Sequence, residues 1–178
     1  MSLENIYFVS SIIAAIGVTA SLVFVGLQVR QSARTAKAEM QVSLMSEMPS
    51  LVMSWHLSER TRGVDPFGAF DFDALPSDLR GALMTFYWNY IKYLETCHYQ
   101  MVHGFLDDEI WQSNVAPLAA MPEDQPLRQY WATRGMLFSP AFHAAVEDAL
   151  VNHPQAAELQ KLMQEARRTA PDATGDET

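Results

Sequence analysis

The sequence predicts an all-α membrane protein in which an N-terminal transmembrane helix continues into a small cytoplasmic helical bundle. Three observations predict this class: an uncharged run between Glu4 and Arg30, a succession of helix-start and helix-stop signals after it, and no stretch of alternating strand pattern. We expect three parts along the chain: a transmembrane anchor at 1–30, a helical domain at 31–168 and a disordered acidic tail at 169–178.

The uncharged run IYFVSSIIAAIGVTASLVFVGLQV is long enough to cross a hydrocarbon core of roughly 30 Å as one helix. A cleavable signal peptide and a fully buried core helix are the alternatives. The start of the chain, MSLEN, lacks the Lys or Arg that a signal peptide needs. The all-round apolar surface and the charge break at Arg30 favour lipid over a protein core. The sequence therefore predicts a single-pass helix from about Ile6 to Val29.

Positive charges follow the span and none precedes it. Arg30, Arg34 and Lys37 form its C-terminal flank, and cytoplasmic segments beside a span are enriched in such residues. This asymmetry predicts a protein of the inner membrane whose N-terminus lies outside and whose C-terminal domain is cytoplasmic.

One narrow face of the span is small and partly polar. At about 100° per residue it contains Ser10, Ala14, Gly17, Ser21 and Gln28. Because small residues let two helix backbones approach closely in lipid, this face indicates a partner, either a membrane protein or a second copy of the chain. The alternative is that small residues, which are common in membrane helices, share a face by chance.

The chain after the span reads as a series of helices. Helix-favouring residues continue to Pro49, and a further helical segment precedes Gly63. Residues 63–77, rich in Gly, Pro and Asp, form the main loop. Later helices are each marked by a start signal: Ser77 or Asp78, with an end at Gly104; Asp107; Pro126; Ser139 followed by Pro140; and Pro154.

The helix that ends near His103 is predicted to be the central element. The arc expected to face solvent contains Asn89, Lys92, Thr96, Gln100 and His103. The opposite arc, expected to face the core, contains Leu79, Leu83, Phe86, Tyr90, Leu94, Cys97 and Met101. Glu95 belongs to neither arc and lies among aromatic positions, so it needs a partner if it is buried. The candidate buried polar side chains of this helix are Glu95, His98 and Gln100.

The spacing of Glu95 and His98 permits two interpretations. It matches half of a di-iron carboxylate site, but the chain has no second Glu-x-x-His, so we expect no metal and no cofactor. The other interpretation makes Glu95 a structural acceptor for a tyrosine hydroxyl, an indole N–H, or an arginine such as Arg128 or Arg134. The aromatic density of this helix could also line a ligand pocket, although large rings more often fill a core.

Composition and missing motifs exclude several function classes. The net charge of -9 and the lack of a basic stripe argue against nucleic acid as a partner. Cys97 is the only cysteine, which we expect to be a buried, inert thiol. The common hydrolase, zinc-protease and nucleotide-binding motifs are missing, so we predict no catalytic residues and no enzyme activity.

Three phrases of the sequence resemble a group of bacterial single-pass, membrane-anchored helical proteins of unknown function. They are GLQVRQSARTAKAE, ETCHYQMVHGFLDDEIWQ and TRGMLFSPAFHAAVEDAL. The chain departs from the group at Met101, where a tyrosine recurs. The resemblance implies the architecture given above and carries no activity. The matching positions are Glu95, Gln100, Gly104, Asp107, Trp111, Phe138, Pro140 and Phe142.

The function expected from these features is that of a membrane-anchored, non-catalytic accessory or scaffold subunit. It would pack against a larger membrane protein complex or self-associate through its transmembrane helix. The alternative is a membrane-tethered bundle enzyme or small-ligand sensor with a site around Glu95 and His98.

Overall fold

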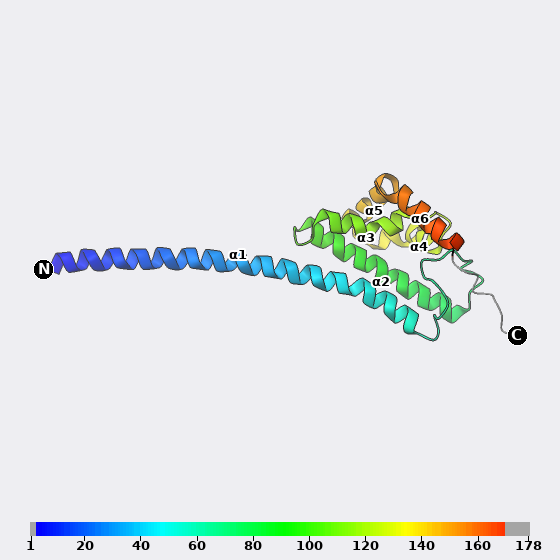
Figure 1. The fold of residues 1–178 in the computed structure, drawn as a ribbon, viewed down its shortest axis with the longest axis horizontal. Helices are drawn as coiled ribbons and strands as arrows, with labels where there is room; N and C mark the ends of the chain where they lie inside the picture. The colour runs from blue at the N-terminus through cyan, green and yellow to red at the C-terminus, as the bar shows by residue number, and fades with distance from the viewer. Residues whose placement is uncertain (1–2, 170–178) are drawn as a thin grey trace. The chain divides into compact units, whose positions relative to one another are not determined.

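The computed structural model describes residues 3–169, and every regular element within them is a helix (Figure 1). The predicted all-α class is confirmed. Of the predicted tail at 169–178, Thr169 is the last residue of the final helix, and residues 170–178 lie outside the described residues. The elements are α1 (Leu3–Leu57), α2 (Ser77–Val102), α3 (Asp108–Ala120), α4 (Pro126–Arg134), the 3-10 helix η1 (Gly135–Leu137), α5 (Pro140–Asn152) and α6 (Ala156–Thr169).

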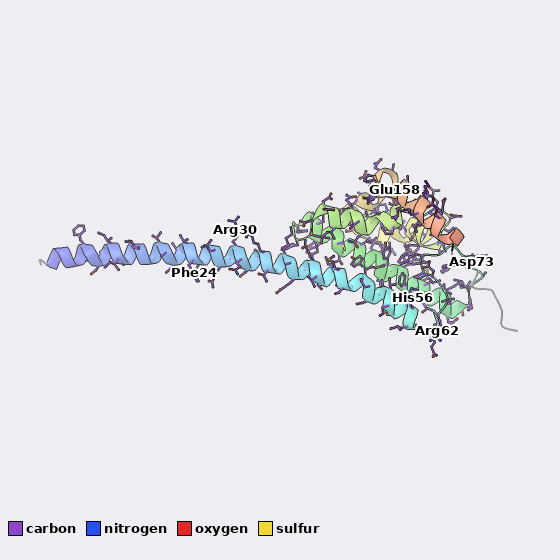
Figure 2. The ribbon with its side chains drawn as sticks, in the orientation of Figure 1. Phe24, Arg30, His56, Arg62, Asp73 and Glu158 are labelled. Atoms are coloured by element: carbon purple, nitrogen blue, oxygen red, sulfur yellow. The ribbon has the colours of Figure 1, made fainter. Side chains whose placement is uncertain are left out.

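The chain divides into two compact units, residues 1–42 and residues 43–178, and the division falls within α1. Among the described helices, α1 alone is long and apolar enough to cross a membrane by length and composition, and its apolar window has no buried residue. Phe24, for example, is 62% exposed and projects from the helix, as Arg30 does at the charged end of the run (Figure 2).

The first correction concerns Pro49, where the sequence suggested a break. α1 continues through this proline as one helix and ends at Leu57. A proline removes one helical N–H bond and can be tolerated where the helix bends or is exposed; Pro49 is exposed. Beyond Leu57 the chain turns, and the hydroxyl and the amide of Thr61 donate to the carbonyls of Trp55 and Ser58 respectively.

The second unit is built around α2, which contacts α3, α4 and α5, while α3 also contacts α5 and α6 (Figure 1). The predicted core arc of α2 is buried except for Met101, which is half-buried. Four further residues of α2 are buried as well: Tyr87, Ile91, Tyr93 and His98. The buried face is wider than a single stripe because Trp55 of α1 and Phe67 of the loop cover α2 on one side, where both contact Phe86.

The helix ends follow the predicted signals with two shifts. Ser139 is the N-cap of α5 and Pro140 is its first residue, and Asp107 is the N-cap of α3. However, α2 begins at Ser77 after Pro76, so neither Ser77 nor Asp78 is its cap. Gly104 ends the α2 turn with a φ of 75°, a value that glycine adopts without strain.

The last helix begins at Ala156 and not at Pro154, because His153 holds the junction between α5 and α6. Its Nε2 lies 3.0 Å from the carbonyl oxygen of Gln112, and its Nδ1 accepts the backbone N–H of Gln155 at 3.2 Å. One imidazole therefore ties the junction to α3 and fixes where α6 starts.

Candidate functional site

Glu95 links the central helix to the start of α5. Its side chain is 19% exposed, and its Oε2 accepts a hydrogen bond from Lys92 Nζ at 2.7 Å. Its Oε1 accepts the backbone N–H of Ser139 at 2.7 Å, across 44 positions of sequence. The partial positive charge at the N-terminus of α5 also stabilises the Glu95 carboxylate, because the helix macrodipole favours an anion there.

The donors to Glu95 are not the groups expected from the sequence. Trp131 donates its indole N–H to Glu147 at 2.7 Å. Arg134 lies over the Tyr130 ring at 5.1 Å and contacts Thr133. Glu95 is thus a structural acceptor whose donors are a lysine one turn away and a main-chain amide.

The pKa of Glu95 reflects two opposing effects. Burial alone would raise the pKa of this carboxyl, but the hydrogen bonds from Lys92 and Ser139 together outweigh burial. The net result is a pKa below the ordinary value of 4.5. Glu95 is therefore ionised at neutral pH and its charge is matched by Lys92.

Lys92 was expected to face solvent, yet aromatic rings restrict the position of its side chain. Its ammonium lies 5.1 Å from the ring centre of Trp88 and 4.9 Å from that of Phe138. Cation–π contacts of this kind each stabilise a partly exposed cation by roughly 0.5–1 kcal/mol. The two rings and Glu95 therefore hold the lysine in one place.

His98 is buried in an aromatic cluster and not in a ligand set. Its ring centre lies 5.1 Å from that of Trp111 and 5.9 Å from that of Phe142. Burial lowers the pKa of His98, and the charge of Glu95 opposes this effect only in part. At neutral pH the imidazole is neutral. Gln100 is half-buried, and its carbonyl accepts the N–H groups of Phe105 and Leu106 at the end of α2.

A cleft of about 520 Å³ lies beside these residues, between α2 and the start of α5. We call it the α2–α5 cleft; its lining includes Glu95, His98, Tyr99, Val102, His103 and Ser139. His103 is held by its own helix, because its Nδ1 lies 2.8 Å from the Tyr99 carbonyl and its ring lies 4.0 Å from the Tyr99 ring. The cleft has a mostly apolar wall, and its lining includes the Glu95 carboxylate and the imidazole rings of His98 and His103.

Metal ligation would need more donors than this cleft brings together. In the described part of the chain, no group of three or more His, Cys, Asp or Glu side chains lies close enough to hold one ion. Glu95 and His98 come from one helix, and the carboxylate is already engaged by Lys92 and Ser139. The arrangement supports a structural role for Glu95.

Cys97 should be unreactive in the folded protein. It is fully buried, and burial raises the pKa of its thiol to about 11; Tyr93 opposes this shift and the charge of Glu47 adds to it. Because the thiolate is the reactive form, we expect Ellman's reagent to modify less than a tenth of the protein in buffer and one thiol per chain in denaturant. Rapid stoichiometric labelling of the folded protein would contradict this burial.

The two groups of α2 whose pKa values are lowered, Glu95 and His98, should make the helical domain less stable in acid. The folded-state pKa of His98 is lowered, so protonation of the unfolded chain removes stability as the pH falls below about 6.5. The folded-state pKa of Glu95 is also lowered, so its contribution is present above 4.5 and is lost as the pH falls further. Urea titrations at several pH values, followed by tryptophan emission, measure both steps.

Variants separate the two steps. Glu95→Gln should remove the step below pH 4.5 and lower the free energy of unfolding at pH 7 by about 1–3 kcal/mol, as for a hydrogen bond to a charged group. His98→Phe should remove the step that begins near pH 6.5. The matched control is Glu59→Gln, at an exposed position after α1, which should change neither the acid steps nor the free energy of unfolding. An acid profile unchanged in both test variants would show that Glu95 and His98 do not set it.

The predicted face of the span is open in the described chain. A Cβ placed on Gly17 would meet no atom within 4 Å, and Ser10, Ala14, Ser21 and Gln28 are exposed. The Ser21 hydroxyl donates to the Gly17 carbonyl at 2.9 Å. Ser21 is therefore satisfied within its own helix and presents a small surface. Of the charged flank, Arg30 and Arg34 are exposed and Lys37 is half-buried.

The described residues form an all-α fold in which one helix is long and apolar enough to span a membrane, together with a helical domain that has an apolar-walled cleft. No protein family, curated protein or solved structure matches the chain. The function is argued below from its own residues.

Proposed function

We propose that this protein is a membrane-anchored, non-catalytic accessory or scaffold subunit. Its span would cross the inner membrane with the N-terminus outside and pack against a membrane protein or a second copy of itself. The observation that carries the proposal is the small, partly polar face of α1 around Gly17 and Ser21, where a Cβ placed on Gly17 would meet no atom within 4 Å.

The chemistry of this face favours close helix packing in lipid. Helix pairs in membranes gain from van der Waals contact where small residues allow the backbones to approach. The Ser21 hydroxyl donates to a carbonyl of its own helix, so close contact there leaves this hydroxyl paired. Gln28 adds an exposed amide near the end of the span, which can hydrogen-bond to a partner helix.

The charges beside the span support the proposed direction. Arg30 and Arg34 are exposed and follow the apolar run directly, and basic residues at a span end favour the cytoplasmic side. The anionic headgroups of that leaflet attract each such residue by on the order of 1 kcal/mol. The helical domain, which follows the flank in the chain, would then be held at the cytoplasmic surface.

Enlarging the small face should weaken association. We expect Gly17→Leu with Ser21→Leu to reduce it roughly tenfold, the change that ~1.4 kcal/mol of lost packing produces. Native mass spectrometry after purification in a mild detergent measures the assembled fraction. The matched control is Ala15→Leu with Thr19→Leu, which has the same spacing on the opposite face and should assemble as the wild type does. A clean wild-type monomer without any co-purifying membrane protein would contradict the proposal.

A second candidate function is a membrane-tethered small-ligand sensor or bundle enzyme that uses the α2–α5 cleft. The observation that favours it is the presence of Glu95, His98 and His103 in one lining. Metal analysis of the purified protein tests the metal version: stoichiometric iron, zinc or manganese that is lost in His98→Ala would support it. Sub-stoichiometric metal would contradict that version.

A further inference from the structure

A second cavity, distinct from the α2–α5 cleft, lies where five segments of the helical domain meet. It measures about 370 Å³ and its wall is formed by the end of α1, the loop before α2, and helices α2, α3 and α6. We call it the methionine pocket, because Met48, Met121 and Met163 line it together with Leu159, Phe67 and Tyr90. Among the described residues, no charged side chain lines it.

This pocket is open to solvent on one side, since most of the side chains that line it are only half-buried. Small-molecule sites occupy roughly 300–1,000 Å³, so its volume is that of a ligand site. A space of 370 Å³ with this lining therefore fits an apolar ligand better than water.

Two polar side chains of the wall, Tyr93 and Asn114, are paired within the chain, which narrows the class of ligand. The Tyr93 hydroxyl donates to Asn114 Oδ1 at 2.7 Å, and Asn114 Nδ2 donates to the Ile110 carbonyl at 2.7 Å. An ionic ligand would find no charged side chain among the described residues of the wall. A ligand made of methylene groups would lose nothing on entering.

We propose that the methionine pocket binds the hydrocarbon chain of a free fatty acid, with the carboxylate left in water at its open side. Methionine side chains are flexible and polarisable, so three of them can adapt to a chain without fixed shape. The chain's own C-terminal segment, TAPDATGDET, is polar and acidic and does not match the lining. The ligand's supply from the bilayer rests on the proposed membrane anchoring, whereas its fit rests on the pocket alone.

Photo-crosslinking of the full-length protein tests the pocket. The probe is palmitic acid with a diazirine on its chain, added to the protein in phosphatidylcholine nanodiscs, with the labelled residues mapped by mass spectrometry. We expect labelling of peptides that contain Met121 and of the segment from Leu159 to Met163. A tenfold excess of unlabelled palmitate should reduce that labelling at least fivefold.

Paired variants of α6 make the test specific. Leu159→Trp fills the pocket and should reduce labelling of Met121 at least fivefold, whereas Leu162→Trp lies on the same helix at a 54% exposed position and should not change it. Labelling confined to residues 5–29, or pocket labelling that unlabelled palmitate does not reduce, would overturn the proposal. The competition arm uses the wild type, so it decides the matter even if Leu159→Trp fails to fold. It is also independent of the association test on Gly17 and Ser21.

Discussion

Replacing Val18 and Leu22 with arginine should remove the protein from the membrane. Both side chains are exposed, at 61% and 67%, near the middle of the uncharged run. An arginine at the centre of a membrane helix costs about 2.5–3.5 kcal/mol on insertion scales, so two should make insertion strongly unfavourable. Alkaline extraction of membranes followed by immunoblotting should find the wild type in the pellet and the double variant in the supernatant or degraded.

The control places the same charges outside the run. Val42 and Met45 are also exposed, at 68% and 65%, and Val42→Arg with Met45→Arg should leave the protein in the pellet. Membrane retention of the variant at Val18 and Leu22 would mean that the protein is held by something other than insertion of this segment.

Phe142→Ala should cause the largest loss of stability of any single change in the helical domain. Its ring is fully buried at the centre of an aromatic cluster. Truncating a buried phenylalanine removes transfer free energy and leaves a cavity, which together cost about 3–5 kcal/mol. Its ring neighbours are His98, Trp111, Trp131 and Phe138, at centroid separations of 5.9, 6.1, 5.7 and 5.9 Å respectively.

Urea unfolding in nanodiscs, followed by tryptophan emission, measures this loss. Val151→Ala is the matched control because Val151 is on the same helix and is 81% exposed; its effect should stay within about 0.5 kcal/mol. If Phe142→Ala cost no more than the control, the aromatic cluster would not be the core of the domain.

Much of the fold could be predicted because its signals are local. The run that ends at Arg30 shows its apolar character residue by residue, and Ser139 followed by Pro140 gives the start of α5 without reference to the rest of the chain. Gly104 ends α2 for a similar reason, since its positive φ suits glycine.

The parts that could not be predicted depend on contacts between distant segments. Glu95 was expected to need a donor if it is buried. Side chains three residues apart on a helix lie close together, so this rule could have identified Lys92 as one donor. The second donor, the Ser139 amide, is set by how α5 meets α2. A helix start leaves backbone N–H groups unpaired, so the Ser-Pro signal could have suggested an acceptor there, but not which one.

The methionine pocket is the clearest case of a feature without a sequence signal. Its lining comes from five segments between Met48 and Met163, and ten methionines in the chain fit gap filling equally well. A void arises from how well side chains fill the space between helices, which local patterns do not determine. Likewise, His98 was singled out by its spacing from Glu95, whereas its packing against Trp111 and Phe142 decides its chemistry.

Cysteine accessibility across the membrane tests the central proposal, an anchored protein with its helical domain in the cytoplasm. Two variants carry an added cysteine, Ser2→Cys before the span and Val151→Cys on the exposed face of α5. The buried Cys97 should remain unlabelled in the folded protein. With a membrane-impermeant maleimide, we expect Ser2→Cys to label in intact spheroplasts and Val151→Cys only in inverted vesicles. Labelling of Val151→Cys from outside intact spheroplasts would contradict the proposed direction, and recovery of both variants as soluble protein would contradict the anchor itself.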